Sequence, residues 1–101
     1  MATAIARIDS DTALAPLVER AEEYVRASVA ENTRRAQRAD WGDFADWCQA
    51  RGLAPLPASP GTVAAYLADL ANSGRKPATI QRRIATISRA HQAAGHPSPT
   101  R

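Results

Sequence analysis

The chain has 101 residues, a formal net charge of +3, 45% hydrophobic residues and only 5% aromatic residues. This length favours one domain of modest size, and the scarcity of strand-forming residues beside abundant alanine predicts packed helices and excludes a large sheet. The single cysteine, Cys48, excludes an internal disulfide and is expected to be buried and inert, and no apolar run approaches the ~20 residues of a membrane span. We therefore expect a cytoplasmic protein without a membrane partner.

The first residues, 1–12, show no hydrophobic periodicity and are predicted to be a disordered lead. Apolar residues then recur at three- and four-residue steps from Leu14 to Val25, which predicts a first helix over about Ala13 to Ala27. Pro16 is compatible with this helix only if it lies in the opening turn, because proline donates no backbone hydrogen bond.

A second helix is predicted to start near Ser28, which could form a capping box with Glu31, or at Asn32, and to end before Gly52. Trp41 and Phe44 share one face of it with Cys48. We expect these aromatic side chains to be core anchors rather than base-stacking residues.

A proline-stiffened connection, Leu53 to Ala58, follows, and Leu53 and Leu56 are expected to pack onto the core. Ser59 and Pro60 then form an N-cap and a first helical position. The third helix presents a buried stripe, and Asn72-Ser73-Gly74 ends it. The members of this stripe are Val63, Tyr66, Leu67 and Leu70.

The fourth helix is predicted to begin at Pro77 or Ala78 and to close at Gly95. Its apolar seam consists of Ile80, Ile84, Ile87 and His91. Opposite this seam the pattern places an outer face that is basic and bears hydroxyl groups. The residues expected there are Arg82 and Arg89, flanked by Thr79 and Thr86, with Arg83 nearer the boundary.

Positive charge gathers at the end of the chain, since Leu70 to Arg101 carries six Lys or Arg and no acidic residue. Such a cluster is typical of proteins that bind polyanions, because Lys and Arg release counterions from nucleic acid. A solvated basic face that serves only solubility is the alternative. The absence of acidic residues from the fourth helix counts against that alternative, because exposed helices usually carry both signs.

No catalytic or metal-binding constellation is evident. Cys48, His91 and His96 have no ligand spacing, so no metal site or cofactor is predicted, and His91 is expected to be a core or boundary residue. Neither a glycine-rich phosphate loop nor a pair of nucleophile and base is present. The chain taken alone is not expected to be an enzyme.

The order of several short motifs resembles the core-binding domain of tyrosine recombinases, the phage-integrase-like enzymes, over about Leu14 to Pro99. These motifs are Glu31 to Ala36, Asp40-Trp41, Phe44, Trp47-Cys48, Gly52-Leu53, Leu56 to Ala58, Val63 to Leu67, Thr79 to Ile87, His91 and Gly95. Gln37, where the family commonly has an aromatic residue, and Ala30, where a capping serine is usual, depart from the pattern.

The resemblance implies an all-α, SAM-like orthogonal bundle of four helices arranged as two crossed helical hairpins, over residues 13–95. Residues 96–101 would begin a linker to the catalytic domain of a longer, prokaryotic, nucleoid-associated recombinase. Double-stranded DNA, that catalytic domain and further recombinase protomers on DNA would be the partners. The DNA-binding residues implied are Thr33, Arg34, Arg35, Arg38, Lys76, Thr79, Gln81, Arg82, Arg83 and Arg89.

A different function stays open beside this one. The first helix is acidic and apolar, with Glu19, Glu22 and Glu23, and it could dock a protein partner. The alternative is therefore a helical protein–protein interaction domain with no role on DNA, because a fold does not decide function by itself.

Overall fold

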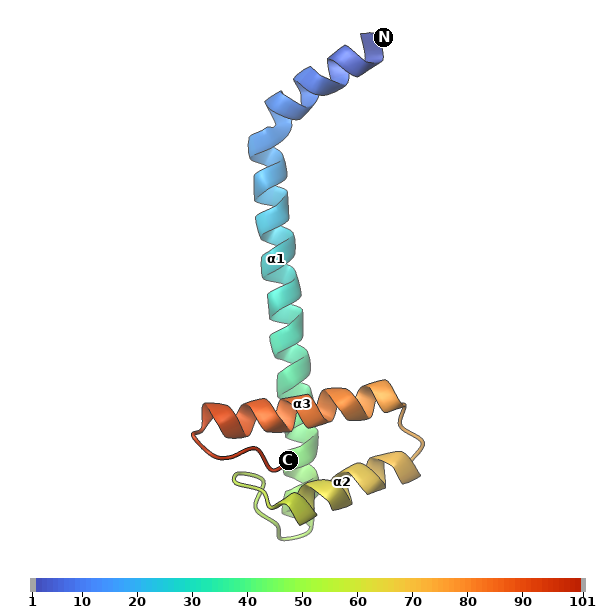
Figure 1. Cartoon of the computed structure of the whole chain (residues 1–101), viewed down its shortest axis with the longest axis vertical. Coiled ribbons are helices and arrows are strands. Elements are labelled where there is room, and N and C mark those ends of the chain that lie inside the picture. Colours follow the sequence, from blue (N-terminus) through green and yellow to red (C-terminus); the bar gives the residue numbers. More distant parts are fainter. Residues whose placement is uncertain (1, 101) are drawn as a thin grey trace. The chain divides into compact units, whose positions relative to one another are not determined.

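The computed structural model describes the backbone of residues 2–100 and the side chains of residues 12–100. Three helices make up the regular structure: α1 (Ala2–Ala50), α2 (Pro60–Asn72) and α3 (Pro77–Ala93) (Figure 1). No strand occurs among residues 2–100, so the predicted all-α class is confirmed. The chain divides into two units, Met1–Arg34 and Arg35–Arg101, and each is described by itself.

One continuous helix, α1, occupies the region where the sequence predicts two helices with a boundary between Ala27 and Asn32. That prediction is wrong because the boundary residues make contacts that suit a helix interior. The Thr33 hydroxyl donates to the carbonyl of Val29 at 2.9 Å, and Arg34 pairs with Glu31 at 3.1 Å. Both contacts link residues three or four positions apart, as on the surface of an uninterrupted helix.

The first unit comprises residues 1–34 and contains the first part of α1. Pro16 lies inside the helix and not in its opening turn, contrary to the prediction. The apolar residues of the predicted stripe are exposed in this unit, with Tyr24 76% exposed. The disordered lead predicted for residues 1–12 falls almost wholly outside the residues whose side chains are described.

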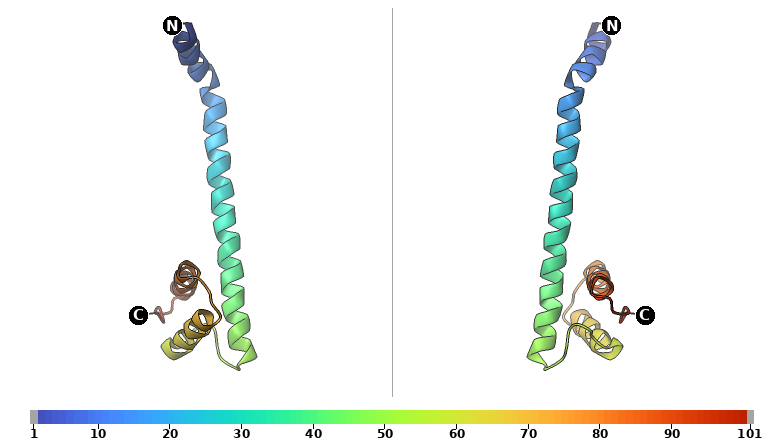
Figure 2. Two further views of the ribbon diagram at one scale, coloured as in Figure 1. Left: turned by 90° about the vertical axis from the view of Figure 1, so that its right-hand side faces the viewer. Right: turned by 90° about the vertical axis from the view of Figure 1, so that its left-hand side faces the viewer.

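The second unit combines the last turns of α1 with α2 and α3, and Figure 2 shows these two helices beside that end of α1. The predicted start of α2 is confirmed: Ser59 is the N-cap, its hydroxyl accepts from the Thr62 amide at 3.1 Å, and proline follows it. The helix α3 begins at Pro77, as predicted. Gly52, with φ of +68°, follows the end of α1 in a backbone conformation that side chains other than glycine rarely adopt.

The core of the second unit is built from all three helices. Phe44 and Tyr66 are fully buried, and their rings lie 4.9 Å apart in an edge-on arrangement. The other buried apolar residues are Cys48, Ala58, Val63, Leu70 and Ile87, and Trp41, Trp47, Leu67 and Ile80 pack against them. The predicted core positions on the three helices are therefore confirmed, except that Ile84 is half-buried and lies outside this cluster.

His91 is fully buried and joins α3 to the connection that precedes α2. Its Nε2 accepts a hydrogen bond from the Ala58 amide at 2.8 Å, and its Nδ1 lies 2.8 Å from the carbonyl of Ile87. An accepting Nε2 leaves the ring proton on Nδ1, which then donates to that carbonyl. The prediction of a core histidine is confirmed.

Of the segments outside the helices, the connection before α2 departs from the prediction, whereas the start of a linker after α3 stays a prediction. Leu53 and Leu56, predicted to pack on the core, are 38% and 40% exposed, because Ala58 is the residue of this connection that enters it. Residues after α3, predicted to start a linker, lie against the unit. The Ser98 hydroxyl donates to that of Ser88 at 2.9 Å, and Pro99 is buried.

Candidate nucleic-acid interface

A connected polar network links the three helices within the second unit. Asp40 on α1 accepts from Arg82 Nε at 2.7 Å, from Arg82 Nη2 at 3.0 Å and from Arg83 Nε at 3.0 Å. Arg83 Nη1 donates to Asp43 and to the Tyr66 hydroxyl, and this hydroxyl donates to Asp43 at 2.6 Å. Two carboxylates thus face two guanidinium groups, which satisfies charges that would be expensive to bury alone.

The two arginines of this network differ sharply in exposure. The Arg83 side chain is 9% exposed and that of Asp40 is 3% exposed, so this ion pair belongs to the interior. The Arg82 side chain is 55% exposed although it shares the same carboxylate. Arg83 therefore serves the fold, whereas Arg82 presents part of its guanidinium to solvent.

Hydrogen bonding shifts the proton affinities of the network. The bond from Tyr66 is the largest cause that lowers the pKa of Asp43, and Arg83 lowers this pKa further while burial opposes both. Burial and the bond to Asp43 raise the pKa of Tyr66, so its hydroxyl stays protonated and is unsuited to act as a nucleophile.

Both guanidinium groups hold their charge. The bond to Asp40 and the charge of this carboxylate raise the pKa of Arg82. For Arg83, desolvation acts to lower the pKa, but the hydrogen bonds to Tyr66 and Asp43 outweigh it and the pKa is raised. Arg82 and Arg83 are thus both positively charged at neutral pH.

The predicted DNA-binding side chains lie on α1, on α3 and at the N-cap of α3, and they belong to both units. Thr33 and Arg34 belong to the first unit and the others to the second. The exposed members are Thr33, Arg34, Arg35, Arg38, Lys76, Gln81, Arg82 and Arg89; Thr79 is half-buried and Arg83 is buried. Within the second unit, the structure brings Arg82 and Arg83 together around Asp40.

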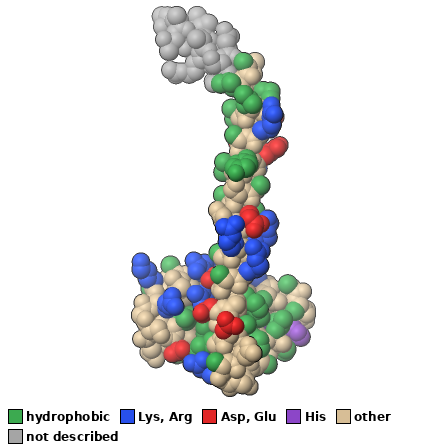
Figure 3. All heavy atoms as spheres, turned by 180° about the vertical axis from the view of Figure 1, so that it is seen from behind, with side chains coloured by type: hydrophobic (Ala, Val, Ile, Leu, Met, Phe, Trp, Pro, Cys, Tyr) green, Lys and Arg blue, Asp and Glu red, His purple; other side chains and the backbone are tan. Residues whose placement is uncertain are grey.

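The outer face of α3 departs from the prediction at two points. Thr86, expected there, is buried, and its hydroxyl has no hydrogen-bond partner among the described residues. The helix itself contains no acidic residue, but Asp40 and Asp43 of α1 reach two of its arginines. Figure 3 shows Lys and Arg side chains on the surface of the second unit with Asp and Glu side chains among them.

The start of α3 offers an anion a favourable approach. Lys76 is its N-cap residue and is exposed, Pro77 follows, and no side chain caps the first turn. The free backbone N–H groups of a helix N-terminus carry partial positive charge. Lys76 adds a full positive charge at the same end of the helix.

Sequence reasoning missed Asp40 and Asp43 as partners of the α3 arginines. Their spacing of three residues places both carboxylates on one side of α1, and Arg82 and Arg83 are adjacent in the sequence. This pairing of two acids on one helix with two arginines on another was the available signal. This signal is weak, because the spacing of residues within one helix does not predict which residues about forty positions away will contact them.

The described part of the chain gives little support for a metal site, a reactive cysteine or a membrane-spanning helix. No group of three or more His, Cys, Asp or Glu side chains there could hold a metal ion. Burial raises the pKa of the Cys48 thiol, which disfavours the reactive thiolate. No helix in the described part is long and apolar enough to cross a membrane.

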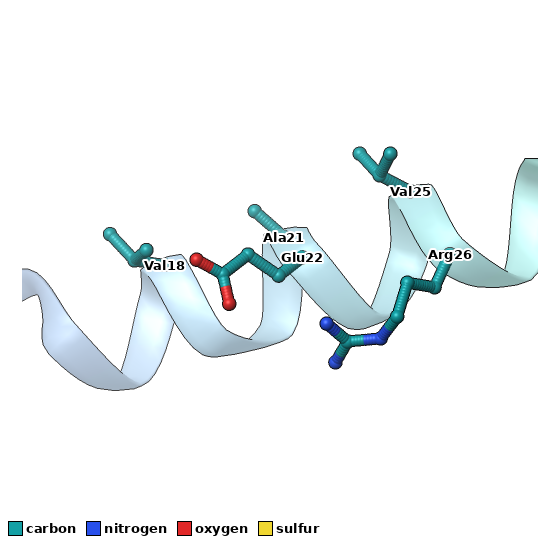
Figure 4. A pocket seen from close by; sticks show the side chains of 5 residues that line it. All are labelled: Val18, Ala21, Glu22, Val25 and Arg26. Atoms are coloured by element: carbon teal, nitrogen blue, oxygen red, sulfur yellow. The ribbon is translucent and has the colours of Figure 1, made fainter.

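Two hollows are apolar and shallow. One, of about 390 Å³, lies along the first unit, where Val18, Ala21 and Val25 project from one side of the helix beside Glu22 and Arg26 (Figure 4). The other, of about 260 Å³, lies in the second unit between α2, α3 and the segment that follows α3. Neither contains the convergent polar groups of a small-molecule site.

Comparison with known proteins finds a similarity over three quarters of the chain. Over 76 residues, the chain is 46% identical to "Integrase/recombinase xerD homolog" of Selenomonas ruminantium. This chain is a homologue of an integrase/recombinase. The match covers 75% of the chain but only 22% of the relative, so the chain spans about a fifth of the length of that recombinase.

The homology confirms the resemblance to recombinases noted in the sequence, and the assignment to one particular domain stays a prediction. No family model matches the chain. No solved structure matches it either.

Proposed function

We propose that this chain is the core-binding, DNA-binding part of a site-specific tyrosine recombinase, which grips duplex DNA at the recombination site for integration or recombination. The observation that carries the proposal is the 46% identity to an integrase/recombinase over 76 residues. The alternative, a protein–protein interaction domain without a role on DNA, is not favoured by this relative. Duplex DNA is the partner, together with the catalytic domain of the parent protein and neighbouring protomers on DNA.

The proposed interface uses the exposed cations of the second unit. Lys76, Arg82 and Arg89 lie at or along α3, and Arg35 and Arg38 lie on α1. Phosphate contacts from such side chains fix a protein on the duplex, whereas amide and hydroxyl groups such as those of Gln81 and Thr79 can read base edges. Thr33 and Arg34, which the resemblance also implies, belong to the first unit and stay predictions.

Arg83 has a different role in this proposal from the one the resemblance implies. Its guanidinium is buried against Asp40, Asp43 and the Tyr66 hydroxyl, so contact with DNA would require these bonds to break. It stabilises the proposed interface indirectly, because its bonds to Asp40 and Asp43 join α3 to α1. Arg83 therefore makes no direct contact with DNA in this proposal.

Catalysis belongs to the remainder of the parent protein in this proposal. The Tyr66 hydroxyl is engaged by Asp43 and Arg83, and Tyr24 is exposed on the first unit. The four-helix, SAM-like bundle stays what the resemblance implies, because α1 is one continuous helix where that bundle would have two.

The test is the affinity of the full chain for a fluorescent duplex, measured by anisotropy across a salt series. We expect affinity to fall steeply with salt, with a log–log slope of about 0.9 for each phosphate contact. Arg89→Ala should weaken binding on every duplex and reduce the slope by about 1. Arg20→Ala is the charge-matched control, because Arg20 is exposed on the first unit and outside the proposed interface.

Two outcomes would contradict the proposal. Absence of binding to duplex DNA at low salt would remove the DNA-binding role. Equal losses in Arg89→Ala and Arg20→Ala would show that only the total charge matters and that α3 is not the docking face.

A further inference from the structure

Asp40 is a buried acidic residue directly beneath a cation of the proposed interface. Its side chain is 3% exposed, and it accepts two hydrogen bonds from Arg82 and one from Arg83. A carboxylate so close to a DNA-facing surface would ordinarily repel phosphate. The effect of Asp40 on DNA binding therefore depends on how Arg82 and Arg83 neutralise its charge and on how it orients Arg82.

The geometry leaves one side of the Arg82 guanidinium available. Nε and Nη2 are bonded to Asp40, at 2.7 Å and 3.0 Å. For Nη1 the structure gives no hydrogen-bond partner among the described residues, and the side chain is 55% exposed. Because the guanidinium is a planar, rigid fork of donors, fixing one edge fixes the direction of the others.

Charge sharing keeps Arg82 attractive to an anion. Asp40 faces two guanidinium groups, since Arg83 Nε binds the same carboxylate oxygen that accepts from Arg82 Nη2. One negative charge is thus divided between two positive charges in this part of the network. The second carboxylate, Asp43, bonds to Arg83, and no contact joins it to Arg82 in the described part of the chain.

We propose that Asp40 is a positioning residue for DNA binding, which holds Arg82 by its Nε and Nη2 edge so that Nη1 meets a phosphate oxygen of the duplex. This inference rests on the proposed function. An unrestrained arginine loses rotamer freedom when it binds, whereas Arg82 is ordered before DNA arrives. The bond between Asp40 and Arg82 persists in the complex.

A double-mutant cycle on DNA affinity tests this role with Arg82→Ala, Asp40→Asn and the double variant. In the unaltered chain we expect Arg82→Ala to weaken binding about tenfold, in the range of one charge-assisted hydrogen bond. In the Asp40→Asn background the same change should weaken binding less than about threefold, because asparagine keeps only one acceptor oxygen and no charge, so the two-bond grip on Arg82 is lost. Asp43→Asn is the matched control: it removes the same charge, leaves Arg82 bonded, and should preserve the tenfold effect.

Two results of the cycle would overturn the positioning role. In one, Arg82→Ala weakens binding by the same factor in the unaltered chain and in the Asp40→Asn variant. In the other, Asp40→Asn tightens binding and makes Arg82 more important, which would identify Asp40 as a competitor of phosphate.

Nuclear magnetic resonance of arginine Nε–H groups in the unaltered chain serves if Asp40→Asn fails to fold. The Arg82 Nε–H signal should stay protected from solvent exchange when duplex is added, and its loss of protection would refute the inference. If the unaltered chain does not bind duplex at all, the proposed function and this inference both fail. Binding that depends on Arg89 but shows no coupling between Asp40 and Arg82 refutes the inference alone.

Discussion

Replacement of Arg83 by methionine should strongly destabilise the second unit. The change removes three hydrogen bonds, from Nε to Asp40 and from Nη1 to Asp43 and to the Tyr66 hydroxyl. Removing one partner of a buried ion pair costs about 3–5 kcal/mol. Asp40 keeps Arg82, and Asp43 is 44% exposed, so its lost bond counts for little; the expected loss is therefore about 3 kcal/mol.

A loss of this size is a large fraction of the total, since a unit of this length is stable by roughly 3–10 kcal/mol. Urea unfolding followed by tryptophan fluorescence suits the measurement, because Trp41 and Trp47 both lie in the second unit. With a slope of about 1 kcal/mol per molar urea, the midpoint should fall by roughly 3 M. Arg82→Met is the control, and its exposed side chain should shift the midpoint by less than about 1 M.

An Arg83→Met variant whose free energy of unfolding lies within about 0.5 kcal/mol of that of the unaltered chain would refute this role of Arg83. Equal losses in Arg83→Met and Arg82→Met would also refute it, because burial would then not distinguish the two arginines.

Two further changes probe the same unit. Since the Tyr66 hydrogen bond and Arg83 lower the pKa of Asp43 in the folded state, its contribution to stability is complete above the unfolded value of 3.8 and is lost as pH falls through the folded value. Asp43→Asn should therefore unfold at lower urea than the unaltered chain at pH 7, with a smaller difference at pH 3; a constant difference would contradict this linkage. Thr86→Val should leave the free energy of unfolding within about 0.5 kcal/mol or raise it by up to ~1 kcal/mol, because it removes a buried hydroxyl that has no partner among the described residues. A loss of stability above ~1 kcal/mol, measured by calorimetry, would show that the hydroxyl is hydrogen-bonded.

The elements that the sequence predicts well are those with strong local signals. Ser59 and Pro60 fix the start of α2 through a side-chain cap and a proline that suits the first helical turn. Pro77 marks the start of α3 in the same way. The buried stripe of each helix follows from three- and four-residue spacing, which any helix imposes on its neighbours.

The failures concern choices that local signals do not decide. Ser28 and Asn32 are good cap residues, but no glycine or proline interrupts the helix there, so the in-helix bonds of Thr33 and Arg34 prevail. The angular spacing along α3 places Thr86 on its outer face, whereas the unit buries this residue. Its burial depends on how the other helices cover α3, and the hydrophobic periodicity of α3 alone carries no information about that packing.

The candidate interface illustrates the same division. Exposure of Gln81 and Arg89 could be predicted from their place on α3 relative to the isoleucine seam. The engagement of Arg82 and Arg83 could not, since their partner Asp40 lies on another helix and about forty residues earlier. Positive charge counted along the sequence thus overstates the charge that the folded unit offers to DNA.

The bond between His91 and the Ala58 amide makes one position in the connection before α2 behave as core. Pro57 and Ser59 on either side of Ala58 are exposed, yet the Ala58 amide is buried and donates to an imidazole held on α3. Its hydrogen should therefore exchange with solvent only when the unit opens as a whole, and not through local fraying. A slowly exchanging amide in an otherwise exposed connection would report the global stability of the unit from a single signal.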